Sequence, residues 1–220
     1  MDFGQWFVPF GEVAPLILKG FWITIEVTIV GLFFGFILGA IAGLARLSRN
    51  KIIYSIATVY VEVVRGTPIL LQIFFVYFGL AALLNITFGA LTAAFIALAF
   101  NSGAYIAEIV RGAVFSIEKG QMEAGRSIGL THTQAMRYVI WPQAIKRMIP
   151  PLGNQFIISL KDSSLFSVIA LGEIVYKGQQ YIATTYNYGQ TYITIAVAYL
   201  IITIPLSLIL RQIERRLDVS

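Results

Sequence analysis

The chain contains apolar stretches long enough to cross a lipid bilayer, and these constrain its fold more than any other feature. The first long run, Gly20 to Ala45, exceeds the roughly 20 residues that a helical span needs. Four later stretches are further candidates: Ile52 to Leu84, Gly89 to Val110, Ile149 to Leu171 and Tyr188 to Leu210. Continuous apolar runs of this kind favour helices, because helices pair their own backbone groups inside lipid. We therefore expect an all-α, polytopic membrane protein with five transmembrane helices in a single domain, residues 1–220.

Composition supports this class and excludes others. Hydrophobic residues make up 58% of the chain and charged residues 12%, and the mean hydropathy is +0.79. The net charge of +5 is more typical of cytoplasmic loops beside anionic membrane lipid than of nucleic-acid binding. The absence of cysteine excludes thiolate metal sites and cysteine nucleophiles. The single histidine, His132, lies outside the expected spans, so we expect neither a metal site nor catalytic residues.

Lysine and arginine predict the orientation of the spans. They concentrate after the first span, between the third and fourth spans, and after the fifth, whereas the other connections are poorer in positive charge. Positively charged loops stay in the cytoplasm, so the N-terminus is expected outside and the C-terminus inside. The connections around Asn85 and Lys177 are then expected on the outer side. The first eighteen residues carry Asp2 and Glu12 and lack an early basic cluster, so we expect no cleavable signal peptide.

Span one carries a glycine at every fourth position, at Gly31, Gly35, Gly39 and Gly43. Small residues in such a row let two helices approach closely in lipid. The row predicts either a dimerisation surface or packing against another helix of the same subunit.

Span two is interrupted by Arg65, Gly66, Thr67 and Pro68. Pro68 removes a backbone donor and disfavours helical geometry at Thr67, so we expect a kink or an unwound turn within the membrane. Transporters build substrate sites at such breaks. A purely architectural kink is the alternative.

Polar residues are expected near the middle of the bilayer in spans two, three and four. At about 1.5 Å per residue, Glu62, Asn101 and Asp162 fall at similar depth. An intramembrane charge costs roughly 2.5 to 3.5 kcal/mol, which suggests a function. The candidate substrate-binding residues are Glu62, Asn101, Ser102, Tyr105, Ser159 and Asp162. A scaffold of ion pairs, with Glu62 bound to Arg65 and Asp162 to another basic residue, is the alternative, and for Glu108 beside Arg111 it is the favoured one.

The polar segment at about 116–142 separates spans three and four. Gly129 can adopt a left-handed conformation and end a first short helix, and Thr131 with Gln134 forms a capping box that starts a second. Pro142 is compatible with the end of that second helix. The outline matches a DNA-binding helix-turn-helix, but both flanks are membrane spans, so no nucleic acid is expected.

The same segment carries a recognisable motif. From Glu123 to Pro142 it follows E-A-G-x-x-x-G, nine residues and then V-x-W-P, which resembles the E-A-A-x-x-x-G-x9-I-x-L-P loop of ATP-binding-cassette importer permeases. Gly125, Val139 and Trp141 depart from the pattern by small-for-small or apolar-for-apolar changes. RGTPILLQ from Arg65, AYIAEIVRG from Ala104 and the stretch from Trp141 to Leu165 also resemble the polar amino acid permeases of bacterial importers.

This resemblance implies a type I importer transmembrane domain in a bacterial cytoplasmic (inner) membrane. It implies a second permease copy or homologue, two cytoplasmic ATPase subunits and an extracytoplasmic amino-acid-binding protein as partners, besides membrane lipid. The residues that it assigns to ATPase coupling are Glu123, Ala124, Gly125, Ser127, Gly129 and Leu130. The substrate is expected to be a polar amino acid, and the midplane carboxylates favour a basic one such as arginine, lysine or histidine.

The chain has no Walker loop of its own, because none of its lysines precedes serine or threonine. We therefore expect no enzymatic activity and no bound cofactor in this chain, with ATP and magnesium held by the partner ATPases. An ion-coupled secondary transporter or channel, in which Glu62 or Asp162 binds protons or cations, is the alternative function. The lack of an obvious inverted repeat argues against it.

Overall fold

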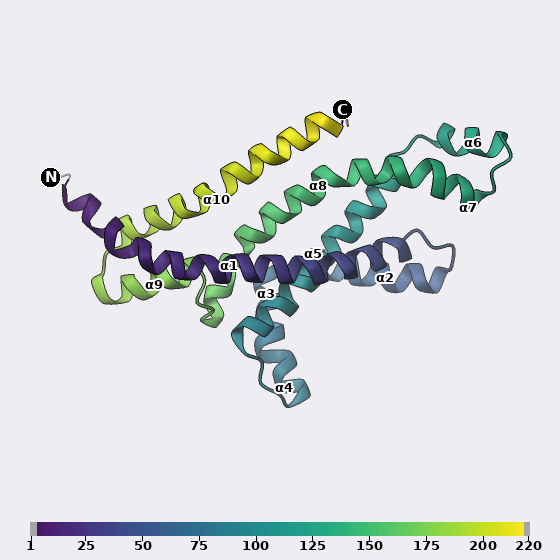
Figure 1. The fold of residues 1–220 in the computed structure, drawn as a ribbon. Coiled ribbons are helices and arrows are strands. Elements are labelled where there is room, and N and C mark those ends of the chain that lie inside the picture. The colour runs from purple at the N-terminus through teal and green to yellow at the C-terminus, as the bar shows by residue number, and fades with distance from the viewer. Residues whose placement is uncertain (1–3, 218–220) are drawn as a thin grey trace.

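The fold is a bundle of long helices, with two short helices at one end and a bent arm at its side (Figure 1). The structure, a computed structural model, describes residues 4–217, with side chains from residue 11 onward. Its elements are α1 (Gly4–Ala45), α2 (Lys51–Arg65), α3 (Ile69–Phe74), the π-helix η1 (Phe75–Leu80), α4 (Ala81–Leu84), α5 (Ala90–Phe115), α6 (Lys119–Ser127), α7 (His132–Ala135), the π-helix η2 (Met136–Ile140), α8 (Trp141–Asp162), the 3-10 helix η3 (Ser163–Ile169), α9 (Ile174–Thr185) and α10 (Tyr188–Leu217). Within residues 4–217 all regular structure is therefore helical, which confirms the all-α expectation.

The helices that could cross a membrane differ in part from the five expected spans. In the described part of the chain, α1 from Gly11, α5 and α10 are long and apolar enough, and α2 with α3–α4 forms a fourth, bent candidate. The fourth expected span, Ile149 to Leu171, is not one helix, because α8 ends at Asp162 and a 3-10 helix follows. Four charged residues, Lys146, Arg147, Lys161 and Asp162, also lower the hydropathy of α8. The chain is a multi-pass membrane protein, and its number of spans stays a prediction.

The glycine row on α1 packs against α5 of the same subunit. A Cβ atom added at Gly31, Gly39 or Gly43 would lie less than 3.0 Å from side-chain atoms of α5, and one at Gly35 would meet Ser102. The facing α5 residues, Leu98, Ser102, Ile106 and Val110, are themselves four apart. The two helices thus lie in contact along complementary rows, as close packing in membranes requires. Intramolecular packing is confirmed for this row, and a dimerisation surface on the same face is wrong, because α5 already covers it.

The break in the second span is present where the sequence predicted it. α2 ends at Arg65, α3 begins at Ile69, and the axes of the two segments differ by 105°. The Gln72 amide donates hydrogen bonds to the carbonyl oxygens of Val64 (2.7 Å) and Thr67 (3.1 Å). The backbone groups released by the break therefore find partners inside the protein, which lipid could not supply.

The arrangement of the helix ends bears on the expected orientation. The N-terminus and α9 lie at one end of the molecule, whereas α6, α7 and the connection between α1 and α2 lie at the other (Figure 1). Two of the segments expected in the cytoplasm thus share one end, whereas α10 ends short of it. Asn85 is an exception: the bent arm of α3, η1 and α4 projects sideways and does not carry it to the end where α9 lies.

Adding a methyl group to Gly39 tests the packing of α1 on α5. A Cβ at Gly39 would lie 2.6 Å from Ile106 Cβ and 2.7 Å from the Gly103 carbonyl oxygen, whereas one at Gly112, also helical, meets nothing within 4 Å. Overpacking typically costs about 1–3 kcal/mol. We expect Gly39→Ala to lower the midpoint of thermal unfolding of the purified protein and Gly112→Ala to leave it unchanged or raise it. Equal midpoints for both variants would contradict the packing.

Candidate functional site

A polar pocket of about 550 Å³ lies at the break in the second span. It is lined by the end of α2, the following turn, the start of α3, and residues of α5 and α8: Arg65, Gly66, Thr67, Pro68, Ile69, Asn101, Tyr105, Gln155, Ile158 and Asp162. The structure therefore brings together three of the six sequence-predicted substrate residues, Asn101, Tyr105 and Asp162. They come from α5 and α8, and they face the same space as the residues at the break.

Asn101 is fixed in the wall of this pocket by a short chain of amides. Its side chain is buried, and Nδ2 donates a hydrogen bond to Gln72 Oε1 at 3.0 Å. The Gln72 amide in turn binds the carbonyl groups at the break. Gln72 was not predicted as a site residue from the sequence. Its position in the apolar run after Pro68 could have indicated a role, because an amide side chain within a membrane needs hydrogen-bond partners.

Asp162 is the last residue of α8 and faces the pocket without a basic partner. Within the described residues, no Lys or Arg nitrogen lies within 4.0 Å of its carboxylate. The ion pair that the scaffold interpretation expected for Asp162 is thus absent from this part of the chain. Because the Asp162 carboxylate lines the pocket and has no basic partner among the residues described there, it is available to a positively charged group on a ligand.

Two predicted serines lie outside the pocket. Ser102 is fully buried between α1 and α5, and its hydroxyl donates to the carbonyl oxygen of Leu98 (2.7 Å). Ser159 lies behind the pocket wall and accepts a hydrogen bond from Gln155 Nε2 (3.2 Å). Gln155, which shares its helical face with Ser159 and Asp162, is the residue that lines the pocket. Ser102 and Ser159 therefore support the helices that carry the lining residues.

Glu62 also lies outside the pocket. Its side chain is 64% exposed, and Oε1 lies 3.5 Å from Arg46 Nη2 at the end of α1. The expected pair of Glu62 with Arg65 is wrong, because the register of α2 turns Glu62 toward α1 while Arg65 faces α5. The two carboxylates predicted at one depth are thus separated, and the pocket contains only Asp162.

A charged cluster adjoins the pocket. Glu108 on α5 accepts a hydrogen bond from Arg46 at 2.5 Å and contacts from Arg111 through both carboxylate oxygens. Arg65 Nη1 lies 3.8 Å from Glu108 Oε2, and its guanidinium stands 5.5 Å from the centre of the Tyr105 ring. The structural role predicted for Glu108 is confirmed, since its carboxylate joins α1, α2 and α5.

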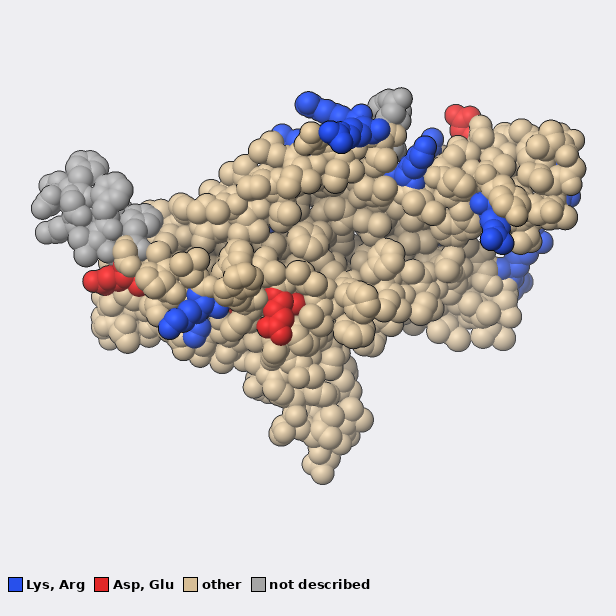
Figure 2. Space-filling model, in the orientation of Figure 1, with Lys and Arg blue, Asp and Glu red and all other residues tan. Residues whose placement is uncertain are grey.

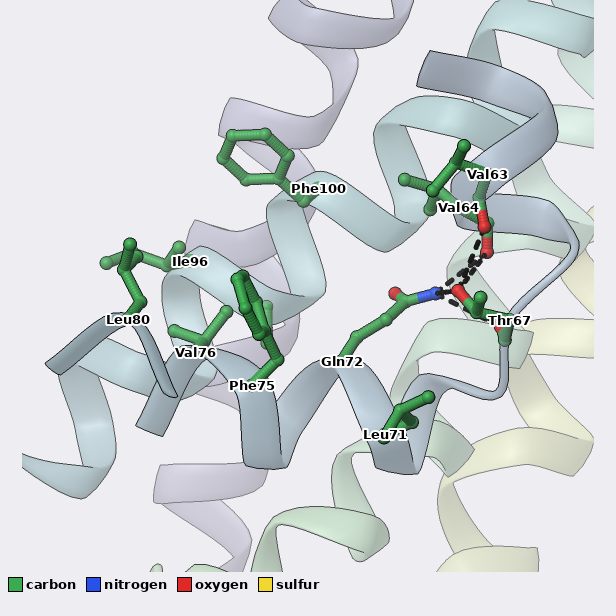
Figure 3. A pocket seen from close by; sticks show the side chains of 11 residues that line it. Val63, Val64, Thr67, Leu71, Gln72, Phe75, Val76, Leu80, Ile96 and Phe100 are labelled. Carbon is green, nitrogen blue, oxygen red and sulfur yellow. Dashed lines mark hydrogen bonds between the residues drawn. The ribbon is translucent and has the colours of Figure 1, made fainter. Parts of the chain in front are cut away.

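A second pocket, also of about 550 Å³, lies on the other side of Gln72. Figure 3 shows it lined mainly by apolar side chains, among them Val63, Leu71, Phe75, Leu80 and Phe100. In the same view the Gln72 amide points away from Phe75 and Leu80, toward Thr67 and the carbonyl group of Val64. This pocket offers little to a polar solute, so the polar pocket is the candidate substrate site.

The polar segment at about 116–142, which is expected in the cytoplasm and is called the cytoplasmic segment below, has the local structure that the sequence predicted. Gly129 has φ of +93° and follows α6, and Thr131 and Gln134 form a capping box at the start of α7. Gly125 is buried, and a Cβ there would lie 3.3 Å from Ala135 Cβ, so α6 packs closely on α7. Glu123, Ala124, Ser127 and Gly129 are exposed, and Leu130 is half-buried. Ile128 was not singled out, although its 79% exposure at the corner suits a contact with another protein.

Pro142 does not end the second helix, contrary to expectation. The chain runs from α7 through the π-helix η2 into α8 without interruption. The Trp141 N–H bonds to the carbonyl oxygen of Met136, five residues earlier, and this wider turn accommodates the proline that follows. The cytoplasmic segment is therefore continuous with the helix that carries Gln155 and Asp162.

Charge and metal-ligand geometry limit the chemistry of the site. Across the described residues, no group of three or more His, Asp or Glu side chains is placed to hold a metal ion. Figure 2 shows a few separate groups of acidic and basic side chains on this face, one of them basic and near the end of α10, with broad uncharged surfaces between them. The arrangement suits a membrane protein that binds a small polar solute between its helices.

Three comparisons with known proteins agree with this geometry. The family described as "Binding-protein-dependent transport system inner membrane component" matches residues 35–219. The glutamine transport system permease protein GlnP of Escherichia coli (strain K12) is 47% identical over 93% of this chain and 94% of its own length. The L-cystine transport system permease protein TcyB of Bacillus subtilis (strain 168) is 42% identical over 93% of this chain and 87% of its own.

A solved structure gives the same result for the fold. The crystal structure of an amino acid ABC transporter with histidines contains a chain that is 40% identical, with a TM-score of 0.92 over 96% of this chain and 98% of its own. The helices, the polar pocket and the cytoplasmic segment therefore lie in a type I ABC transporter transmembrane fold. The chain belongs to the binding-protein-dependent transport system inner membrane component family and is a permease subunit of an amino acid ABC importer.

Proposed function

We propose that the polar pocket binds the transported amino acid and that the cytoplasmic segment couples it to ATP hydrolysis. The observation that carries the proposal is the pocket at the break of the second span, where Asn101, Tyr105, Gln155 and Asp162 face one space. Transporters place substrate sites at discontinuous helices near the bilayer midplane. An ion-coupled transporter or channel would leave the cytoplasmic segment without a function.

The charges of the pocket favour a neutral polar amino acid. Its lining contains one carboxylate, Asp162, and one guanidinium, Arg65, together with the amides of Asn101 and Gln155. The first expectation, a basic substrate, depended on two carboxylates, and Glu62 is outside the pocket. A zwitterion with an amide side chain, such as glutamine, matches one cation, one anion and two amides. The similarity to a glutamine permease supports this choice.

The coupling proposal concerns the exposed residues of α6 and the corner that follows it. We infer that Glu123, Ala124, Ser127 and Gly129, with Ile128, contact an ATPase subunit, and that Gly125 and Leu130 hold the two short helices together. α8 begins where this segment ends and reaches the pocket after 22 residues, about 33 Å at 1.5 Å per residue. A movement of the cytoplasmic segment would thus be transmitted along one helix to Gln155 and Asp162.

The proposed assembly has two permeases, two separate ATPases that hold ATP and magnesium, and an extracytoplasmic binding protein that delivers the amino acid. Closure of the ATPases would rock the permease pair and turn the pocket from the outer to the inner side. The site of action is a bacterial inner membrane. In this assembly the chain crosses the membrane five times with its N-terminus outside, and α8 together with η3 forms the fourth span.

Co-purification of an ATPase with this chain tests the assembly directly, and its absence would favour the ion-coupled alternative.

Neutralising one carboxylate inside the pocket and one outside it tests whether the pocket binds the substrate. Asp162→Asn removes the anion of the pocket, so we expect amino acid-stimulated ATPase activity of the assembled transporter to need about tenfold or more substrate. Glu62→Gln is the matched control, since it removes a carboxylate outside the pocket. Both complexes should remain assembled. An unchanged response in Asp162→Asn, or an equal loss in Glu62→Gln, would contradict the pocket assignment. Stimulation by arginine or lysine but not by glutamine would restore the basic substrate.

A β-branched residue at the corner tests coupling. At Gly129, φ is +93° and a Cβ would meet nothing within 4 Å, so Gly129→Val strains the backbone without a clash. We expect transport and ATPase stimulation to fall while insertion and folding persist. Gly120→Ala, on α6 and also free of contacts, is the control and should behave like the parent. If Gly129→Val supports full transport, the corner does not couple.

Single-cysteine labelling tests the orientation, because the chain has no cysteine of its own. We expect an impermeant thiol reagent added from outside to react with Gln179→Cys in α9 and not with Gln134→Cys in α7. Permeabilised cells should label both and provide the control. The reverse pattern in intact cells would overturn the five-span arrangement.

A further inference from the structure

Arg65 stands between the polar pocket and the charged cluster on α5. It is the last residue of α2, lines the pocket, and lies 3.8 Å from Glu108 and 5.5 Å from the centre of the Tyr105 ring. Its side chain is 37% exposed, so the guanidinium is accessible from the pocket. The guanidinium of Arg65 could therefore bind an anion either in the charged cluster or in the pocket.

Glu108 is largely engaged by other arginines. Its carboxylate accepts a hydrogen bond from Arg46 at 2.5 Å, and Arg111 Nε lies 3.1 Å from one oxygen and 3.2 Å from the other. By comparison, the 3.8 Å separation from Arg65 is too long for a hydrogen bond. Within the described part of the chain, the guanidinium of Arg65 therefore has an ion-pair partner but donates no hydrogen bond.

The cluster also carries an excess of positive charge. Arg46, Arg65 and Arg111 contribute three positive charges, whereas Glu62 and Glu108 contribute two negative charges, which leaves one cation uncompensated among these described groups. Guanidinium groups bind carboxylates best through two parallel hydrogen bonds. Asp162 lines the same pocket, but its carboxylate lies more than 4.0 Å from the Arg65 guanidinium. An anion bound between them would supply the missing hydrogen-bond acceptors for Arg65.

We propose that Arg65 binds the α-carboxylate of the transported amino acid and exchanges its contact with Glu108 for this stronger one. The inference rests on the proposed function of the pocket and specifies the group of the substrate that is recognised. Asp162 lines the same pocket and faces the α-ammonium group or a polar side chain. Arg65 is thus a specificity-determining residue: it requires a free α-carboxylate and excludes amines and amides of the same size.

Competition binding tests this assignment without any variant. The permease–ATPase complex, reconstituted without the binding protein, is given radiolabelled glutamine, and unlabelled glutamine or glutamine α-amide is the competitor. The α-amide keeps the shape and the α-ammonium group but lacks the carboxylate charge. We expect it to compete roughly 10- to 100-fold more weakly, as the loss of a charge-assisted pair predicts. Equal competition would overturn the assignment.

Two substitutions of Arg65 then test whether this residue causes the difference in affinity between glutamine and its α-amide. Arg65→Gln should reduce the ratio of the two affinities to about one, and Arg65→Lys should retain part of the preference because it keeps the charge. Arg111→Gln is the matched control: Arg111 also contacts Glu108 but does not line the pocket, so the ratio should persist. A ratio kept in Arg65→Gln, or lost equally in Arg111→Gln, would contradict a direct contact. If no polar amino acid binds the unmodified complex, the proposed function fails instead.

Discussion

The hydrogen bonds of the Gln72 amide at the break in the second span determine much of the structure. A chain that turns by 105° within the membrane leaves carbonyl groups without helical partners, and the Gln72 amide binds those of Val64 and Thr67. Asn101 donates to the oxygen of the same amide and so connects the break to α5. The break, the wall of the polar pocket and the position of Asn101 therefore depend on one side chain. Its removal would strand polar groups in an apolar environment, which is costly.

Close helix packing makes this arrangement rigid. The glycine row of α1 lets α5 approach until its neighbours at Leu98, Ser102, Ile106 and Val110 lie against the backbone of α1. α5 is thus held on one face by α1, while another face carries Asn101 and Tyr105 to the pocket. In the second half of α5, the Glu108 carboxylate joins this helix to Arg46, which directly follows α1, and to Arg65 of α2. Packing and charge fix the same helix from two sides.

Local features were predictable from the sequence because their causes are local. The break at Pro68, the left-handed Gly129 and the capping box of Thr131 with Gln134 each depend on a few neighbouring residues, and all three are present. Side-chain partners depend on helix rotation and on tertiary packing, which spacing along one helix does not fix. Glu62 therefore pairs with Arg46 instead of Arg65, and Ser102 faces α1 instead of the pocket. Pro142 shows a related limit: a π-helical turn, visible only in the structure, lets the helix continue.

That continuation has a functional meaning, because α8 joins the cytoplasmic segment to the pocket in one element. A helix that ended at Pro142 would separate the two by a flexible joint. The continuous helix instead makes the position of Asp162 depend on that of the cytoplasmic segment. The central claim is that this chain holds the amino acid in the polar pocket, between the turn at Arg65 and the end of α8. A structure of the assembled transporter with bound L-glutamine tests it most directly. The account predicts ligand density in contact with Arg65, Asn101 and Asp162, and density elsewhere with this pocket filled by protein side chains would contradict it.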